Sequence, residues 1–525
     1  MKNPFPIEKL SRLEFGSVDG FRDEELEDTF VRTTFIDRFL QDKHSIITGP
    51  IGSGKSALFT LLKNRSDKIG IFKDRTVISI DELIPFSKIK SFSSSLNNID
   101  ERQLYQFIWK FHITQKITEY LSTLSNFPRN NEEKEINEFL KSINSKEYNE
   151  AVIDKLLGLI NHSQIRFKTK ISNTPIDIEA SLNKKNKKKE KINLDKVLSN
   201  CIYIIQQRRM NNLLIIIDKI DTFVAGEEYD TQRKYIEALL EVDDDMFISY
   251  PEIGRKIFLR KDLYSRLNFE YLGRDKVDDN TLPISWTQVE LILFLGSRIK
   301  NALIKEKLLT KKDLEEKTKH SFIYRIFFFY KKEDKSVSQK QEYMQNIITK
   351  VFPHVVKHKN EKCQEEKIDV FDFFTTHFFN SQKEVSPRNL LIFLKKVNDF
   401  AVTYYDENRD KKAEVLSIKN RTEWRLYRHD FIYKAYVESK KDFIRNIASA
   451  DNKWKKHFSI FLKNIGKRQT FDLKWIKKQI EEDDIESAIF CAYLESVGFL
   501  CIREEHVDIK KRKYELPIMY IPRCT

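Results

Sequence analysis

The chain has 525 residues, which is too long for one ordinary domain and predicts roughly three. Hydrophobic residues make up 40% of it and aromatic residues 12%, so buried cores are expected and wholesale disorder is excluded. The scarcity of glycine (13) and proline (12) excludes collagen-like and turn-dense all-β folds and favours a helix-rich chain.

Lys and Arg number 93 against 79 Asp and Glu, a formal net charge of +14. This excess fits contact with nucleic acid, and it equally fits the Lys-, Asn- and Ile-rich composition of an AT-rich coding sequence. The five cysteines are scattered without a C-x-x-C pair, which excludes a zinc ribbon or disulfide framework and predicts a reducing, cytoplasmic setting. Neither a signal peptide nor a long apolar run is present, so no membrane partner is expected.

Residues 1–43 form an N-terminal lead-in segment, acidic around 23–28 and then helical in its apolar spacing. A short β-branched run, His44–Thr48, follows and passes through a glycine-rich turn into a helix that begins near Lys55. A second strand is predicted at Thr76–Ile80. The next stretch, about 85–205, is mostly helical and is expected to be an insertion.

The run Leu213–Asp218 is the purest apolar stretch in the chain and is typical of a strand buried on both faces of a parallel sheet. Two more strands are predicted at Lys256–Arg260 and Thr281–Ser285, with a helix at Trp286–Lys300. Strands that alternate with helices indicate an α/β parallel sheet, so residues 44–300 are expected to form one α/β core.

Residues 301–400 are expected to form a helical, lid-like region with charged loops at 331–340 and 357–367. Residues 401–525 are expected to be helical and to end in a winged-helix-like unit. That outline rests on helices at 473–480 and 485–497, followed by strands at 499–503 and 514–518.

Gly49–Ser56 satisfies G-x-x-x-x-G-K-[ST], with a strand before it and a helix after it. Glycine lets the backbone turn its N–H groups inward to cradle phosphate oxygens, and the helix dipole adds positive potential there. We expect Lys55 to contact the β- and γ-phosphates of ATP and Ser56 to ligate Mg²⁺. The expected nucleotide-binding residues are Gly49, Gly52, Ser53, Gly54, Lys55, Ser56 and Ala57.

Asp218 ends the buried apolar strand, where a carboxylate can hold Mg²⁺ directly or through water. Ser56 and Asp218 are therefore the expected metal ligands. The strand Thr76–Ile80 is expected to lie between the strands that carry Lys55 and Asp218, as the added strand of hydrolysing ATPases. This arrangement makes a small-molecule kinase less favoured.

Three further residues are candidates for catalysis. Lys219 occupies the place where many such ATPases carry the Glu that polarises water, so Asp221 is the nearest carboxylate for that role. Arg260 ends a predicted strand near the nucleotide, and Arg388 opens a helix behind the N-cap Ser386 and Pro387. Each arginine is expected to sense or stabilise phosphate charge, the alternative being an ordinary surface ion pair.

In their order along the chain, these motifs resemble STAND- and KAP-like P-loop ATPases, and more narrowly a bacterial family of P-loop ATPases frequently found among anti-phage defence genes. The resemblance implies a nucleotide-dependent switch, with Asp221 in the D-x-x-D position, Arg260 as a sensor and Arg388 as a second sensor like that of origin-recognition ATPases. Lys219 departs from the small residue usual there. The segments that carry the resemblance are Phe15-Gly16, Phe30–Thr33, Gly49–Ser56, Leu214–Asp221, Ile257–Leu263, Ile284–Trp286 and Ser386–Arg388.

Two functions remain open from the sequence. The first is a slow ATPase switch that forms a homo-oligomer and acts with a separately encoded effector protein in phage defence. The second is a DNA-binding ATPase that uses its C-terminal winged helix, with 484–497 as the recognition helix. Two basic runs, Lys184–Lys191 in a solvated loop and Lys510–Lys513 at the wing, predict at most weak, nonspecific DNA or RNA contact. No nuclease motif is present.

Overall fold

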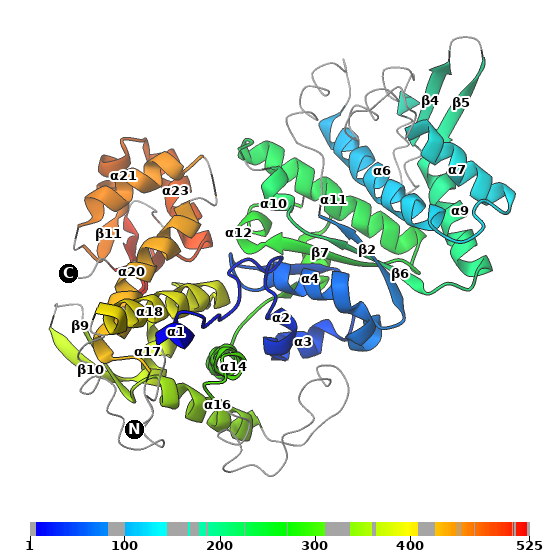
Figure 1. Cartoon of the computed structure of the whole chain (residues 1–525). Coiled ribbons are helices and arrows are strands. Elements are labelled where there is room, and N and C mark those ends of the chain that lie inside the picture. Colours follow the sequence, from blue (N-terminus) through cyan, green and yellow to red (C-terminus); the bar gives the residue numbers. More distant parts are fainter. Residues whose placement is uncertain are drawn as a thin grey trace.

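A five-stranded parallel sheet lies at the centre of the larger lobe, in a computed structural model of the chain (Figure 1). Its strand order is β2-β6-β7-β1-β8, and all four neighbouring pairs run parallel. The structure describes residues 7–81, 100–143, 166–167, 178–184, 187–224, 226–269, 271–309, 337–359, 364–407, 426–448, 451, 453–466, 468–506, 508 and 511–521.

The strands of this sheet are β1 (Ile46–Gly49), β2 (Arg75–Ile80), β6 (Asn212–Ile217), β7 (Gly254–Arg260) and β8 (Thr281–Pro283). The helices joined to them are α2 (Leu26–Thr29), α3 (Thr34–Phe39), α4 (Lys55–Arg65), α6 (Glu101–Ser122), α7 (Asn131–Ile143), α9 (Leu194–Gln207), α10 (Ile220–Phe223), α11 (Tyr229–Ser249), α12 (Lys261–Tyr264) and α13 (Arg274–Asp279). Two 3-10 turns, Ser66–Lys68 and Gly70–Phe72, connect α4 to β2.

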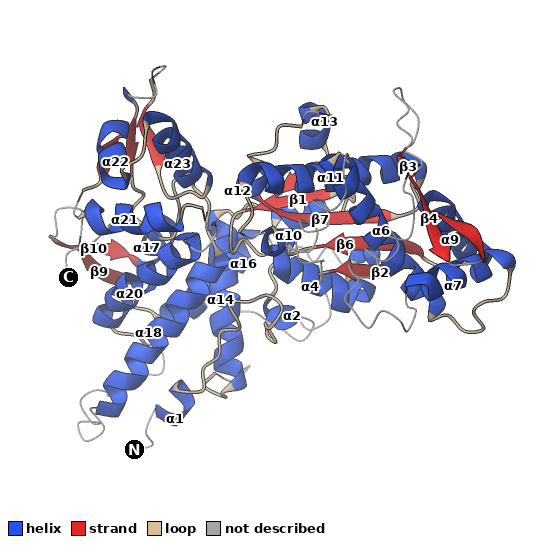
Figure 2. Ribbon diagram, turned by 90° about the horizontal axis from the view of Figure 1, so that it is seen from above, coloured by secondary structure: helices blue, strands red, loops and turns tan. Residues whose placement is uncertain are grey.

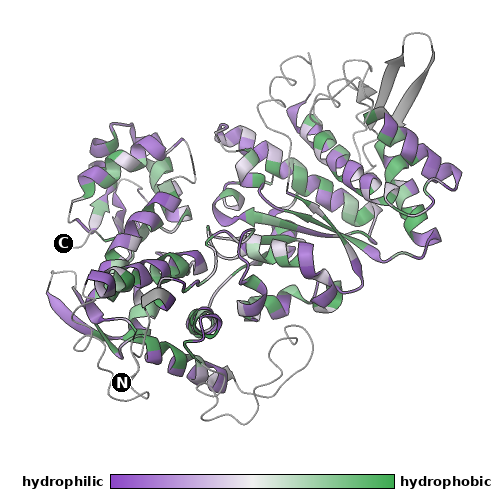
Figure 3. Cartoon of the chain, viewed as in Figure 1, coloured by the Kyte–Doolittle hydropathy of each residue, from purple (hydrophilic) through white to green (hydrophobic). Residues whose placement is uncertain are grey.

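Strand β6 shows why the sheet is buried on both faces. Leu213, Ile215 and Ile217 join the core under α6, α9 and α11, whereas Leu214 and Ile216 join the core under α3 and α4. Because successive side chains of a strand point to opposite faces, a continuous apolar run supplies both cores at once. The central strands are largely apolar in Figure 3. Their parallel pairing confirms the predicted α/β parallel sheet.

The added strand between β1 and β6 is β7, so the prediction that Thr76–Ile80 would occupy this place was wrong. Strand β7 pairs with β1 on one side and β6 on the other, whereas β2 lies at the edge beyond β6. The physical reason is burial: β7 carries a continuous buried run from Lys256 to Leu259, and β2 is mostly half-buried. Order along the chain does not fix order in a sheet.

Beyond β2, helices α6, α7 and α9 cover one face of the sheet, and an antiparallel sheet of β3 (Arg166–Phe167), β4 (Ile178–Lys184) and β5 (Lys187–Asn193) extends from them. The basic run that was expected to be a loop therefore lies largely on the hairpin strands β4 and β5. Residues 185 and 186 of that run lie outside the described residues.

The second lobe is largely helical and includes the C-terminal unit (Figure 2). Its helices are α1 (Ile7–Leu10), α14 (Gln288–Lys305), α16 (Val337–Val351), α17 (Val370–His377), α18 (Pro387–Glu407), α20 (His429–Ala448), α21 (Lys455–Ile465), α22 (Leu473–Ile480) and α23 (Asp484–Ser496). Its strands are β9 (Val355–Lys359), β10 (Glu365–Asp369), β11 (Thr470–Asp472), β12 (Cys501–Glu504) and β13 (Lys513–Glu515).

The predicted loop at 357–367 contributes to both strands of the β9–β10 hairpin, with 360–363 outside the described residues. Residues 331–336 of the other predicted loop also lie outside them, and 337–340 begin α16. The C-terminal unit packs α21, α22 and α23 with the antiparallel sheet β11-β13-β12. Helices α22 and α23 and strands β12 and β13 correspond to the predicted outline, to which the structure adds α21 and β11. Among the described helices, none has the length and apolar character that a membrane span requires.

The lead-in segment belongs to both lobes. Leu10, Leu13 and Phe15 pack into the core of the helical lobe, where α1 lies along α18. Further along, Leu26 and Phe35 pack into the core under α4. Figure 1 shows α2 and α3, which carry them, beside α4. The intervening residues therefore cross from one lobe to the other above the glycine-rich turn.

Candidate functional site

The glycine-rich turn links the end of β1 to the start of α4. Gly52 and Gly54 adopt φ values of 78° and 107°, a left-handed backbone that strains any residue with a Cβ. At Gly52 a Cβ would also lie 2.3 Å from Ser386 Oγ and 2.8 Å from Arg388 Cβ. The turn is therefore held between its own helix and the first residues of α18.

Lys55, in the first turn of α4, is buried and points back over the glycine-rich turn. Its Nζ donates hydrogen bonds to the carbonyls of Gly49 at 2.6 Å and Pro50 at 2.9 Å. Burial lowers the pKa of Lys55 to about 8, and the nearby carboxylates of Asp221 and Asp218 partly oppose this. Because a buried ammonium group is poorly solvated, it favours an anionic ligand with which it can form charge-assisted hydrogen bonds.

Asp218 follows β6 and faces α4. Burial raises the pKa of its carboxyl to about 6, against the effect of hydrogen bonds from the Lys219 N–H and the Ser56 hydroxyl. Within the described chain no hydrogen-bond partner reaches Asp218 Oδ2. A buried carboxylate oxygen without a partner, beside a serine hydroxyl, is a donor set that fits Mg²⁺.

Asp221 and Arg260 form an ion pair, with 3.3 Å between Asp221 Oδ2 and Arg260 Nη1. Arg260 ends β7 opposite Gly49 in the adjacent strand, which brings it to the turn. Asp262 accepts two further hydrogen bonds from Arg260, at 3.0 Å from Nε and 2.6 Å from Nη2. Burial alone would lower the pKa of Arg260, but the charges of Asp262 and Asp221 outweigh it and raise the pKa.

Lys219, the departure noted in the sequence, is turned away from this cluster. Its backbone is left-handed at φ 64° and begins α10. Its Nζ lies 4.0 Å from the ring centroid of Phe21 in the lead-in segment, a cation–π contact. The Lys219 side chain therefore holds the lead-in segment against the end of β6.

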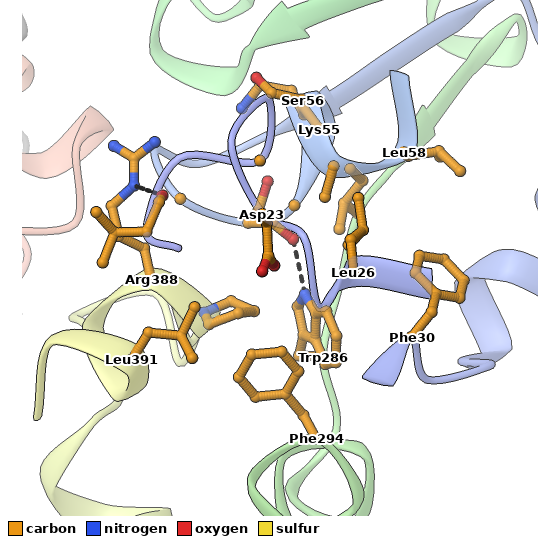
Figure 4. A pocket seen from close by; sticks show the side chains of 18 of the residues that line it. Asp23, Leu26, Phe30, Lys55, Ser56, Leu58, Trp286, Phe294, Arg388 and Leu391 are labelled. Atoms are coloured by element: carbon orange, nitrogen blue, oxygen red, sulfur yellow. Dashed lines mark hydrogen bonds between the residues drawn. The ribbon is translucent and has the colours of Figure 1, made fainter. Parts of the chain in front are cut away.

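Arg388 lies in the first turn of α18, where its backbone N–H approaches the Gly52 carbonyl at 3.5 Å and its Nε donates to the Val18 carbonyl at 3.2 Å. Burial lowers the pKa of Arg388, although Asp19 and Asp221 oppose this. Arg388 therefore lines the same pocket as Lys55, Asp218, Asp221 and Arg260 although it is far from them in sequence. Figure 4 shows Arg388 and Lys55 at this pocket.

A cavity of about 330 Å³ joins these residues. One side is the polar turn with Lys55 and Ser56, and the other is apolar (Figure 4). The lead-in forms much of the wall, and Gly20 packs so closely on α4 that a Cβ would lie 2.6 Å from the Ala57 nitrogen. The apolar side is lined by Leu26, Phe30, Leu58, Trp286, Phe294 and Leu391.

Several residues that complete this site were not among the sequence-predicted site residues. Trp286 Nε1 donates a hydrogen bond to the Ser53 carbonyl at 2.9 Å and so holds the glycine-rich turn against the residues that precede α14. Asp23 and Arg298 form a buried two-bond ion pair, at 3.0 and 2.6 Å, that fixes the lead-in to α14. The sequence signal for Asp23 was only an acidic stretch, whose partner is far away in sequence.

Neither a family model nor a curated protein matches the sequence. Among solved structures, the chain is similar to the Orc1 protein of Aeropyrum pernix in complex with DNA. The match is 10% identical, covers 95% of this chain and 93% of that chain, and has a TM-score of 0.34. At that score the likeness carries no argument about the activity or partners of this chain.

Proposed function

We propose that the protein binds ATP with Mg²⁺ and hydrolyses it slowly. The observation that carries this proposal is the meeting of Lys55, Ser56 and the partnerless oxygen of Asp218 at a glycine-rich turn that opens a helix. Backbone N–H groups of Gly52 to Ala57 would hold the phosphates, and Lys55 would leave its carbonyl partners for the β- and γ-phosphates. Ser56 and Asp218 would hold Mg²⁺, which offsets phosphate charge.

The apolar side of the cavity would take the base. Leu26 and Phe30 from the lead-in face Phe294 and Leu391 from the helical lobe, so both lobes would contact the bound nucleotide. An aromatic and aliphatic slot of this kind suits a flat heterocycle, with polar groups only at the phosphate end.

Slow hydrolysis follows from the carboxylates. Asp221 would orient the attacking water, but its Oδ2 is already engaged by Arg260 Nη1. Arg260 and Arg388 would stabilise charge on the γ-phosphate. Lys219 supplies no carboxylate and contacts Phe21 instead.

Nucleotide state would control the C-terminal unit through a chain of buried ion pairs. Arg260 contacts Asp262, Arg266 lies 3.8 Å from Asp262, and Arg266 also contacts Asp451 at 3.2 Å. Asp451 lies just before α21 and also accepts a hydrogen bond from the Tyr229 hydroxyl. A change in the Asp221–Arg260 contact on nucleotide binding would thereby reach Asp451, just before α21.

A homo-oligomeric switch that acts with a separate effector in anti-phage defence belongs to this proposal, as does a cytoplasmic location. Its support is the resemblance to STAND- and KAP-like ATPases together with the linkage from the nucleotide site to α21. A DNA-binding ATPase of the origin-recognition type is the alternative. A cryo-EM comparison of particles with and without an ATP analogue, with effector or duplex DNA added, would separate the two.

Calorimetry with Mg²⁺ and a nonhydrolysable ATP analogue tests nucleotide binding. Lys55→Ala is expected to weaken binding by a few kcal/mol, roughly the charge-assisted phosphate bonds that it removes. Lys63→Ala, on the same helix with an exposed ion pair to Asp81, is the matched control and should bind normally. No binding heat from the wild-type protein at high micromolar nucleotide would refute the proposal.

A further inference from the structure

The C-terminal unit is electrically divided. Residues 453–478, which contain α21, β11 and α22, include nine Lys or Arg and a single acidic residue, Asp472. Residues 479–502, which contain α23, include six Asp or Glu and no Lys or Arg. The basic residues therefore lie mainly on α21 and α22, whereas the winged-helix outline would place α23 in a DNA groove.

Helix α23 is unsuited to a phosphate backbone. Its exposed side carries Ile485 and Ile489, which are 72% and 41% exposed. The flanking carboxylates Asp484 and Glu486 are already paired with Lys477 and Lys453, at 2.7 and 3.2 Å. The face therefore offers apolar and acidic groups where a DNA reader needs cations and hydrogen-bond donors.

The wing strands are also poorly suited to DNA. Lys513 pairs with Glu504 at 2.7 Å, and Arg503 lies 3.7 Å from Glu515. Arg512 donates from Nε to the His506 carbonyl at 3.2 Å. The basic cluster predicted at the wing is thus largely engaged within its own sheet, although Lys510 lies outside the described residues.

Helices α21 and α22 present the opposite picture. Their apolar sides pack together through Phe461 and Trp475, 5.9 Å between ring centroids, and the Arg468 guanidinium lies 5.1 Å from the Trp475 ring. Lys477 of α22 pairs with Asp484, whereas five other lysines of α21 and α22 and Arg468 in the loop between them form no ion pair with another described residue. We call these exposed residues the α21–α22 basic face: Lys455, Lys456, Lys463, Arg468, Lys474 and Lys478.

We propose that the α21–α22 basic face binds the phosphate backbone of duplex DNA without sequence preference. Five lysines without an ion-pair partner among the described residues, together with Arg468, supply the counterion release that drives such binding. The other exposed residues of α21 and α22 are polar, so the face offers no apolar side chain to insert into a lipid surface. DNA would thus contact α21 and α22. Helix α23, the recognition helix of the winged-helix outline, would remain available to a protein.

The test uses the full chain without nucleotide, so its result does not depend on the ATP site. Fluorescence anisotropy of a labelled mixed-sequence duplex of about 30 base pairs is measured between about 50 and 200 mM KCl. Lys474→Gln/Lys478→Gln is expected to weaken binding and to reduce the slope of log affinity against log salt by about two, because each phosphate contact contributes about 0.9. Lys134→Gln/Lys141→Gln on α7 removes the same charge from the other lobe and should bind as wild type.

Four outcomes would overturn the proposal. The α22 pair could leave the salt slope unchanged, or the α7 pair could reduce it equally, which would show a net-charge effect alone. A larger loss in Lys511→Gln/Lys513→Gln would return binding to the wing. Sedimentation with phosphatidylserine vesicles completes the test: wild-type protein that binds vesicles but not duplex would make the face a membrane contact.

Discussion

Asp218 is the residue at which burial and function oppose each other most directly. A carboxyl whose pKa is higher in the folded chain than in the unfolded one lowers stability at every pH above its unfolded value of 3.8. The shift to about 6 corresponds to an unfavourable term of about 3 kcal/mol at pH 7, at 1.36 kcal/mol per pKa unit. The protein keeps this strained carboxylate where Mg²⁺ would relieve it.

Replacing Asp218 should therefore separate stability from binding. Asp218→Asn is expected to raise the free energy of unfolding of the nucleotide-free protein at pH 7, by up to about 3 kcal/mol, and to abolish stabilisation by Mg²⁺–ATP. At pH 4 the gain should shrink, because the native carboxyl is then protonated. Chemical denaturation at both pH values measures this, and a variant less stable than wild type at pH 7 would contradict it.

Asp221 is predicted to act in hydrolysis rather than in binding. Asp221→Asn should bind ATP within about tenfold of wild type, a difference of about 1.4 kcal/mol, yet lose most turnover because the group that orients water is gone. Phosphate release at saturating ATP is the measurement, with Glu228→Gln on the exposed neighbouring loop as control. Wild-type turnover in Asp221→Asn, or its loss in Glu228→Gln, would move the role to that loop.

At the scale of elements, local patterns in the sequence were sufficient for the glycine-rich turn, for α4 and for the strand that ends at Asp218. These features depend on spacing within about ten residues. The place of β7 depends on which strand pairs with a neighbour along both of its edges. The role of Trp286 depends on its contact with Ser53, and that of Asp23 on its ion pair with Arg298. Such long-range pairings are set by packing and leave no local signal.

Helix α18 is the element that connects the turn to the helical lobe. Arg388→Ala should weaken ATP binding by less than about tenfold, since Lys55 remains, while it removes ATP-dependent assembly. Lys395→Ala, an exposed position on the same helix, is the control. Light scattering with and without an ATP analogue decides: assembly that persists in Arg388→Ala would show that α18 does not report the nucleotide.

For the whole molecule, the ion-pair chain from Asp221 to Asp451 predicts that the C-terminal unit responds to nucleotide. Asp451→Asn breaks the last link and should abolish ATP-dependent change in hydrogen exchange of α21 and α23, with ATP affinity nearly unchanged. Asp430→Asn, which removes an exposed pair with Arg428, should leave the response intact. A response preserved in Asp451→Asn would show that the lobes are linked elsewhere.

The lead-in segment also affects how the chain folds during its synthesis. Its residues are synthesised before α18, yet the cavity wall that they form is completed by Pro387, Arg388 and Leu391. Until α18 has been synthesised, Leu10, Leu13 and Phe15 lack most of the apolar partners that bury them. A nucleotide held in this cavity would therefore stabilise chains that extend past α18 more than shorter ones, and prematurely terminated products should be more exposed to cellular proteases.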